Sequence, residues 1–287
     1  MATLDELQAQ LAALTQRVNE ITAPPDDYYT HRFSGEEIDN AVDRVKATPG
    51  SGAITAGDIG AATAPLLSDV ILYVNGTSGS DSNPGTQSEP FKTIQAAVDS
   101  LPKNLGEHSA TIKILPGVYD EDILFYGFYN GYSPVNNNFD GIFITSDSDP
   151  VEIRSLSFIN CLVASILAAN IKIIGGVSTS KIGVRVVGCP HVVLSVCEIN
   201  GCTKGLSCGT YFTGGGSSVY LNVCTISNCT ESAIYAEGQN NIYAETPAGN
   251  DNAVGITAYY GAVVTTRGSL MTATTEQRIY AGFINKF

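Results

Sequence analysis

The sequence predicts an all-β body built as a β-solenoid, preceded by a helical N-terminal part. Three observations support this prediction. The chain opens with a heptad pattern; from residue 70 onward it consists of short β-rich runs broken by Gly, Asn and Asp; and these runs recur every 22 to 28 residues. With 287 residues, the chain is long enough for one elongated domain with appendages or for two small domains.

The composition excludes several classes of protein. The chain carries 28 acidic and 15 basic side chains, a net charge of −13, with 15% charged and 44% hydrophobic residues. This apolar fraction is ample for a core and excludes a highly charged disordered chain. The acidic balance argues against nucleic-acid binding, because phosphate contacts need clustered Lys and Arg. We find no long apolar run and no signal peptide, so we expect no membrane insertion and synthesis in a cytoplasm.

Residues 1–22 carry an unbroken a/d heptad pattern, which Pro24 and Pro25 end. A lone amphipathic helix of this length is marginal in water, so the apolar seam favours a parallel oligomeric coiled coil. The alternative is a helix packed on its own domain. The heptads alone do not determine the number of strands. The expected oligomerisation residues are Leu4, Leu7, Leu11, Leu14, Val18 and Ile21.

Two segments separate the heptads from the β-rich body. In residues 23–47, Ser34 and Glu37 form a capping box before an apolar stripe, which predicts a short helical attachment segment. His31 lies in this segment without a nucleophile or metal partner nearby in sequence, so we expect it to pack. Residues 48–70 are rich in Gly, Ala, Ser and Thr and predict a linker.

The body, residues 71–268, repeats itself. Runs of equivalent residues recur at a near-constant offset, which is typical of a solenoid with two or three short β runs per coil. Leucine-rich repeats share this period, but their consensus is missing. One family pairs Cys197 with Cys224, Cys202 with Cys229 and Ile199 with Ile226, each 27 residues apart, and Cys161 with Cys189, 28 apart. A second family contains Ile182-Gly183-Val184, Gly205-Leu206, Ala233-Ile234-Tyr235 and Gly255-Ile256-Thr257.

Stacking explains the seven cysteines. Coils of a β-helix lie about 4.8 Å apart, so inward residues one period apart form ladders of like residues, and Cys is a small apolar residue that suits such a ladder. Disulfides between stacked pairs are conceivable but unneeded. No Cys/His spacing matches a zinc site, so we predict no metal and no cofactor.

A solenoid needs a cap over its first coil. The run SEPFKTIQAAVDSLP predicts a capping helix over residues 90–101, beginning near Pro90 and ending at Pro102. Residues 269–287 are expected to cap the other end.

The run YVNGTSGSDSNPGTQSEPFKTIQAAVDSLP, followed by ATIKILPGVYDEDI, resembles the opening of the pectate-lyase-like right-handed parallel β-helices. The similarity is close over residues 72–123 and looser, by repeat pattern, to about residue 268. Such domains are abundant in tailspikes and tail fibres of bacteriophages and prophages, and HRFSGEEIDNAV and ITAGDIGAA also resemble N-terminal pieces of phage tail proteins. The resemblance implies a homotrimer in the virion tail, attached to other tail or baseplate proteins through its N-terminal region.

The family includes polysaccharide lyases and hydrolases, so cleavage has to be weighed. Glycoside hydrolysis needs two carboxylates about 5 to 10 Å apart, one of them kept protonated. Acidic turns are also the ordinary way to solubilise a solenoid edge, and the body is short for a depolymerase, so we assign no catalytic residue. The acidic candidates are Asp120, Glu121, Asp122, Asp140, Asp147, Asp149 and Glu152, and the candidate bases of a lyase are Arg154 and Arg185.

A binding surface is the favoured expectation. Residues 125–139 interrupt the coil pattern with aromatic, Gly and Asn residues, and aromatic faces beside amides suit sugar rings. Packing of these aromatics at a trimer interface or between coils is the alternative. The same choice applies to Tyr259 and Tyr260, where packing at the far end of the solenoid is favoured. The glycan-binding candidates are Tyr126, Phe128, Tyr129, Tyr132, Asn136, Asn137 and Asn138.

The sequence therefore predicts a tail fibre or receptor-binding protein that recognises a bacterial surface glycan, and it favours a non-enzymatic role. A tailspike depolymerase is the first alternative. A bacterial surface adhesin is the second, and the missing signal peptide and wall anchor disfavour it.

Overall fold

The computed structural model describes residues 65–130, 140–146, 151–175, 181–209, 216–268 and 271–286. All of these lie in the second of two units into which the chain divides, residues 61–287. The predicted coiled coil (1–22), the attachment segment (23–47) and most of the linker (48–70) lie outside the described residues.

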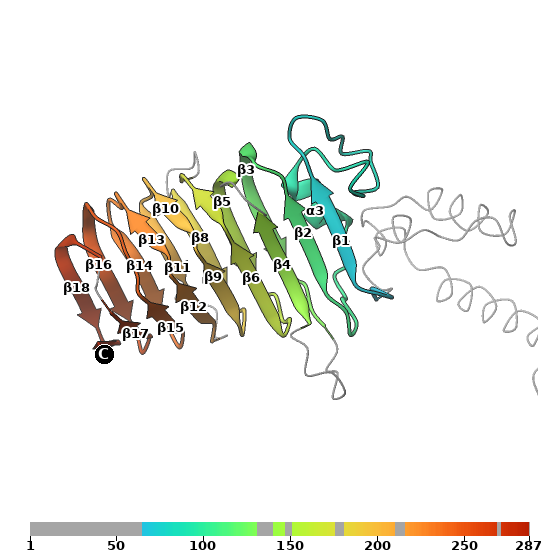
Figure 1. Cartoon of the computed structure of the whole chain (residues 1–287). Coiled ribbons are helices and arrows are strands. Elements are labelled where there is room, and N and C mark those ends of the chain that lie inside the picture. The colour runs from blue at the N-terminus through green and yellow to red at the C-terminus, as the bar shows by residue number, and fades with distance from the viewer. Residues whose placement is uncertain are drawn as a thin grey trace, which may run out of the picture. The chain divides into compact units, whose positions relative to one another are not determined.

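The body consists of two parallel sheets whose strands follow one another along a single direction (Figure 1). The nine-stranded first sheet contains, in spatial order, β1 (Val70–Val74), β2 (Ala110–Ile114), β4 (Gly141–Ser146), β6 (Ser165–Ala169), β9 (Val192–Ser195), β12 (Ser218–Asn222), β15 (Asn241–Glu245), β17 (Val263–Arg267) and β19 (Phe283–Lys286). The ten-stranded second sheet contains β3 (Gly117–Tyr126), β5 (Val151–Ile159), β7 (Ile171–Ile173), β8 (Ile182–Val187), β10 (Glu198–Asn200), β11 (Lys204–Cys208), β13 (Thr225–Ser227), β14 (Ser232–Glu237), β16 (Asn252–Tyr259) and β18 (Ala273–Tyr280).

The second sheet divides at β5. Residues Val151–Ile153 of β5 pair with β7, whereas residues Leu156–Ile159 of the same strand pair with β8. The middle coils therefore have three faces: the first sheet, a short branch of β7, β10 and β13, and a long branch of β8, β11, β14, β16 and β18. The chain visits these faces in turn and its strands pair in parallel with the equivalent strands of the next coil, so the described residues form a mostly parallel β structure that is compatible with the predicted β-solenoid. The right-handed winding and the homotrimer stay predictions.

The core lies between the sheets and follows the alternation of each strand. In the first sheet, one inward position reads Ile112, Ile144, Ala168, Leu194 and Leu221 along the coils, and all five are buried. β-branched and other apolar residues suit these pleated, half-buried strands because one side chain in two faces the core.

The registers confirm both repeat families. Ile199 pairs with Ile226, and Leu206 pairs with Val184 on one side and Ile234 on the other. All seven cysteines are free and buried. They are core residues, as the stacking argument predicts.

The predicted capping helix is present but shorter than expected. It is α3 (Ile94–Ser100), with Thr93 as N-cap, instead of a helix over residues 90–101. Pro90 does not start it because the Pro90 carbonyl accepts hydrogen bonds from the Ser80 N–H (3.1 Å) and the Asn83 side chain (2.9 Å), which hold this residue in the preceding loop. The helix buries Ile94, Ala97 and Val98 against the first coil.

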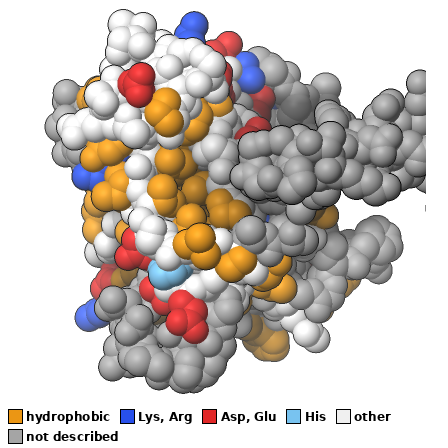
Figure 2. Space-filling model, turned by 90° about the vertical axis from the view of Figure 1, so that its right-hand side faces the viewer, with side chains coloured by type: hydrophobic (Ala, Val, Ile, Leu, Met, Phe, Trp, Pro, Cys, Tyr) orange, Lys and Arg blue, Asp and Glu red, His pale blue; other side chains and the backbone are white. Residues whose placement is uncertain are grey.

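The N-terminal end of the solenoid carries hydrophobic side chains on its surface. Figure 2 views this end and shows them gathered in a band across it. Among the residues near β1, the Leu67 side chain is 85% exposed and Ile71 is 51% exposed. The outer edge of β1 is nevertheless covered by backbone hydrogen bonds. The Tyr73 N–H donates to the Gly85 carbonyl (2.8 Å), the Asn75 N–H donates to the Phe91 carbonyl (2.8 Å), and the Phe91 N–H donates to the Tyr73 carbonyl (2.9 Å).

The C-terminal segment differs from its prediction. Residues 269–287 were expected to form a cap, but β18 pairs with β16 and β19 pairs with β17, so the described part of this segment is one more coil. It continues the solenoid because its alternating residues still match the register of the coil before it. No strand covers the outer edge of β18 or β19 among the described residues.

Candidate functional site

Two acidic residues of the opening motif hold the cap in place. One oxygen of Asp81 accepts hydrogen bonds from the N–H groups of Lys92 (3.0 Å) and Thr93 (2.8 Å). The two oxygens of Glu121 accept from Ile94 (3.0 Å) and Gln95 (2.9 Å), the first N–H groups of α3. These donors have no partner within the helix, so the carboxylates satisfy them. Glu121, a candidate acid from the sequence, is therefore a structural residue.

Tyr119, which lies in the run ATIKILPGVYDEDI, joins the loop after β1 to the corner between β2 and β3. The Tyr119 hydroxyl accepts from the Gly76 N–H (3.1 Å) and donates to the Leu115 carbonyl (2.8 Å). Burial raises the pKa of Tyr119, so the hydroxyl keeps the proton that it donates.

Three of the remaining acidic candidates, Asp120, Asp122 and Glu152, form surface ion pairs. Arg154 bridges Asp120 (2.9 Å) and Asp122 (3.1 Å) across neighbouring coils, and the Asp120 side chain is 83% exposed. Glu152 pairs with Lys172 at 3.2 Å. Hydrolysis instead needs a carboxyl group sheltered enough to stay protonated. Asp147 and Asp149 lie outside the described residues.

The aromatic candidates do not form one surface. Phe128 is fully buried, with its ring centroid 5.9 Å from that of Phe125, so its assignment as a glycan contact is corrected: it is a core residue. Its burial follows from Gly127, whose positive φ of 70° turns the chain inward at this corner. Tyr126 and Tyr129 are 55% and 42% exposed. Tyr132, Asn136, Asn137 and Asn138 lie outside the described residues.

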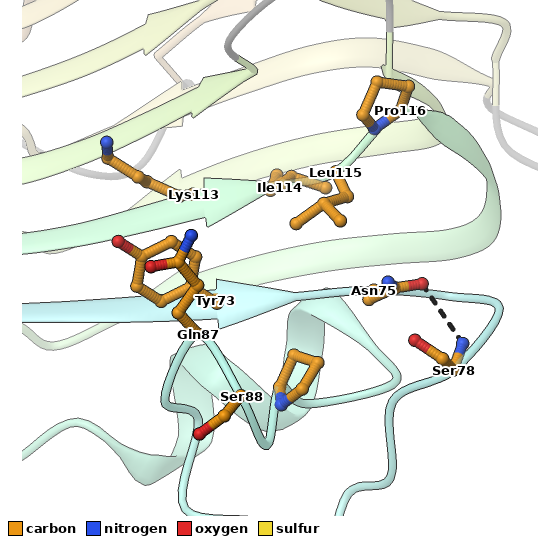
Figure 3. A pocket seen from close by; sticks show the side chains of 10 residues that line it. Tyr73, Asn75, Ser78, Gln87, Ser88, Lys113, Ile114, Leu115 and Pro116 are labelled. Atoms are coloured by element: carbon orange, nitrogen blue, oxygen red, sulfur yellow. Dashed lines mark hydrogen bonds between the residues drawn. The ribbon is translucent and has the colours of Figure 1, made fainter.

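A cavity of about 340 Å³ lies where β1 and β2 end (Figure 3). Tyr73 and Asn75 come from β1 and the residue after it. Lys113 and Leu115 come from β2 and the corner that follows, and Gln87 comes from the loop before α3. The remaining lining residues are Ser78, Ser88, Pro90, Ile114 and Pro116.

Coil stacking brings these residues together. Tyr73 and Lys113 are paired in register, 40 residues apart, and both alternate with inward residues, so their side chains leave the same face of the first sheet. The loop stays beside them because the Tyr73 N–H donates to the Gly85 carbonyl at 2.8 Å. Asn75 shapes the near rim: its side-chain oxygen accepts from the Thr77 (3.0 Å) and Ser78 (3.1 Å) N–H groups, the latter drawn in Figure 3.

The lining suits a small polar ligand with an apolar face. It combines one aromatic ring, two side-chain amides, three hydroxyl groups and one ammonium with Leu and Pro side chains. Its volume is at the lower end of the range of about 300 to 1,000 Å³ for ligand pockets. None of the ten lining residues is acidic. The cavity therefore offers hydrogen bonds and an aromatic face but no carboxylate pair.

Sequence reasoning missed this cavity. Its residues come from three separate segments, and β3 separates its corner from Tyr126 by roughly 30 Å of extended chain. The alternation along each strand predicts that Tyr73 and Lys113 point outward. It does not predict that the two residues occupy the same position in neighbouring coils.

The tyrosines near the C-terminal end form ladders of their own. Tyr259 and Tyr280 stack with ring centroids 4.5 Å apart, and Tyr235 and Tyr260 lie 5.5 and 5.8 Å from Tyr259. This packing agrees with the alternative that the sequence left open for Tyr259 and Tyr260.

Comparisons with protein-family models, with curated proteins and with solved structures find no match. Within the described part of the chain, no group of three or more His, Cys, Asp or Glu residues is placed to hold a metal ion. The helix found there is too short and too polar to cross a membrane.

Proposed function

We propose that the protein is a tail fibre or receptor-binding component of a bacteriophage or phage-derived particle. In this proposal, a homotrimer of right-handed β-helices recognises a bacterial surface glycan. The cavity beside β1 and β2 carries the proposal, because its lining has the groups that a sugar ring needs and no acidic side chain.

The chemistry of the lining supports a sugar. The Tyr73 ring offers an apolar face to the C–H groups of a pyranose, while Gln87, Ser88 and Lys113 offer hydrogen-bond donors to its hydroxyl groups. Asn75 uses its side-chain oxygen within the protein, so it offers a ligand only its amide nitrogen. Lys113 favours a glycan that carries carboxylate or phosphate groups.

The acidic candidates support binding rather than cleavage at this site. Glu121 is held by the amino end of α3, and Asp120 and Asp122 are held by Arg154. In the described residues, none of the three lines the cavity. A depolymerase remains the alternative that the assay below separates from a binder.

The test is a binding assay of the full chain against purified wall polysaccharides and teichoic acids, read for both retention and chain length. A Tyr73→Ala, Gln87→Ala double variant should weaken binding by about tenfold or more, because it removes the aromatic face and an amide. Unchanged thermal unfolding would show that the variant is folded.

A Tyr126→Ala, Tyr129→Ala variant is the matched control. It removes two exposed tyrosines outside the cavity and should leave affinity unchanged. If the Tyr126→Ala, Tyr129→Ala variant loses binding and the Tyr73→Ala, Gln87→Ala variant does not, the binding site lies in residues 125–139. Shortening of the polysaccharide would establish a depolymerase, and no retention on any bacterial glycan would overturn the proposal.

A further inference from the structure

The outward face of the first sheet is free of charge over four successive coils. The strands β4, β6, β9 and β12 alternate inward and outward side chains. None of their outward residues is acidic or basic. These residues, which we term the uncharged face, are Phe143, Thr145, Leu167, Ala169, Val193, Ser195, Ser218, Tyr220 and Asn222.

An apolar column runs through the middle of the uncharged face. Phe143 pairs in register with Leu167, Leu167 with Val193, and Val193 with Tyr220. Tyr220 continues the column by stacking on Tyr243 of β15, with ring centroids 5.4 Å apart. The flanking positions carry small uncharged side chains, such as Thr145, Ala169 and Ser195.

The second sheet has the opposite character at the same level of the solenoid. Its outward residues there include Arg154, Lys172 and Lys204, and each makes an ion pair at 2.9 to 3.2 Å. Charges reappear on the first sheet at Lys113 of β2 and at Glu245 and Arg267, which pair at 3.3 Å. The lack of charge is therefore a property of one face and not of the chain.

We propose that the uncharged face is the surface on which copies of this chain meet in the oligomer. The centres of protein interfaces are depleted of charge and enriched in aromatic side chains, which describes this column with its small polar borders. Each chain has a net charge of −13, so long-range electrostatic repulsion opposes the approach of two copies. A face whose outward residues are uncharged adds least to this repulsion.

The heptads of residues 4–21 specify this occupant. They predict parallel self-association, and a closed oligomer with rotational symmetry brings the bodies of its copies to the same height. Each coil then meets the same coil of a neighbouring copy, and the apolar column faces its own equivalent around the axis.

The uncharged face is small compared with a stable protein interface, which limits how strongly it can hold two copies together. Four coils about 4.8 Å apart and strands of five residues at about 3.3 Å give a flat area of roughly 300 Å². Stable interfaces bury about 800 Å² on each partner. The face is therefore too small to join free bodies, and it acts once the N-terminal tether raises the effective concentration of the copies.

The test is site-specific cross-linking of the full chain with a short bis-maleimide. Ala169→Cys places a thiol on the uncharged face, and Ser157→Cys places one on the outward face of β5 in the second sheet. All seven native cysteines are buried, so they give little background. The covalent dimer fraction of Ala169→Cys should exceed that of Ser157→Cys by about tenfold or more.

A second variant tests the role of charge. Adding Leu167→Glu to Ala169→Cys puts a like charge on each copy at the column and should abolish the difference from Ser157→Cys, with circular dichroism and the urea midpoint reporting the fold. Equal cross-linking at both positions, or a monomeric mass for the full chain, would overturn the proposal. Blocking of the Ala169→Cys thiol by bound polysaccharide, without cross-linking, would assign the face to a glycan instead.

Discussion

At the scale of single residues, the corners explain the cysteines. Six of the seven place Sγ 3.4 to 3.7 Å from the carbonyl oxygen two residues earlier. The residue before each adopts the left-handed region, and these residues are Asn160, Gly188, Val196, Gly201, Val223 and Asn228, with φ between 51° and 70°. The left-handed residue turns the chain, and the next side chain then points into a narrow corner that suits a small apolar group.

The thiols should be unreactive in the folded protein. Burial raises the pKa of Cys202 and Cys208 to about 12 and that of Cys229 to about 11, from a usual 9.0, so these three form no thiolate near neutral pH. Hydrogen bonds with Cys189 and Cys197 lower the pKa of Cys161 and Cys224, so burial alone protects these two thiols. We expect a thiol reagent at pH 8 to label none of the seven cysteines in the native chain and all seven in urea. Rapid labelling of native protein would contradict this placement.

The same pKa values predict a loss of stability at high pH. The unfolded chain releases thiol protons above pH 9 while the folded chain retains them to about pH 11 or 12, so the unfolded state binds fewer protons in this window. The free energy of unfolding should be insensitive to these groups below pH 9 and fall as the pH rises above it. Urea titrations at pH 8 and pH 10 measure the difference.

At the scale of elements, equivalent strands pack so closely that small residues are required. Gly183, Gly205 and Ala233 occupy one register position in β8, β11 and β14. A Cβ at Gly205 would lie 2.4 Å from Cγ2 of Ile226 and 2.6 Å from the carbonyl oxygen of Ala233. The repeat of small residues in the sequence thus reflects contact between successive coils.

Gly205→Ala should therefore destabilise the protein. The added methyl group has to displace a core side chain and a backbone carbonyl, and overpacking of this kind costs about 1 to 3 kcal/mol. Chemical denaturation measures the change. Thr265→Ala, on the outward side of β17, is the control and should change the free energy of unfolding little. Equal stability of Gly205→Ala and the natural chain would show that the coils are less tightly packed than described.

At the scale of the whole molecule, the two ends of the solenoid are unequal. The first coil is covered by α3 and by the loop whose backbone hydrogen bonds complete the edge of β1. At the other end Ile279, Tyr280 and Phe283 are 51%, 51% and 63% exposed. Each coil is stabilised mainly by its neighbours, so a coil with one neighbour opens more easily.

Hydrogen exchange of the full chain should show this gradient. Amides of β18 and β19 should exchange fastest among the strands, and those of β6 and β9, with paired strands on both sides, should exchange slowest. Uniform protection from β2 to β19 would contradict the gradient and would indicate that the C-terminal end is covered in solution.

Much of this architecture was predictable because a solenoid repeats. The offset of 27 residues between cysteines is the same offset that the registers establish between β10 and β13. Two predictions differ from the structure: the bounds of the capping helix, and a cap in place of a further coil over residues 269–287. Both features depend on hydrogen bonds to segments distant in the chain. Phe128 was wrongly predicted to be a surface residue. The sequence around it, with Gly and Tyr as neighbours, does not indicate whether its side chain points inward or outward.

The sequence by itself determined the fold class, the repeat, the cap and the burial of the cysteines, since all of these follow from local periodicity. Only the tertiary structure decided that Tyr73, Gln87 and Lys113 share a cavity, that Glu121 anchors a helix, and that one face of the first sheet is uncharged. The physical reason is that the function of a solenoid side chain depends on its neighbours above and below. Those neighbours lie one coil away, and the length of each coil is set by its corners and loops.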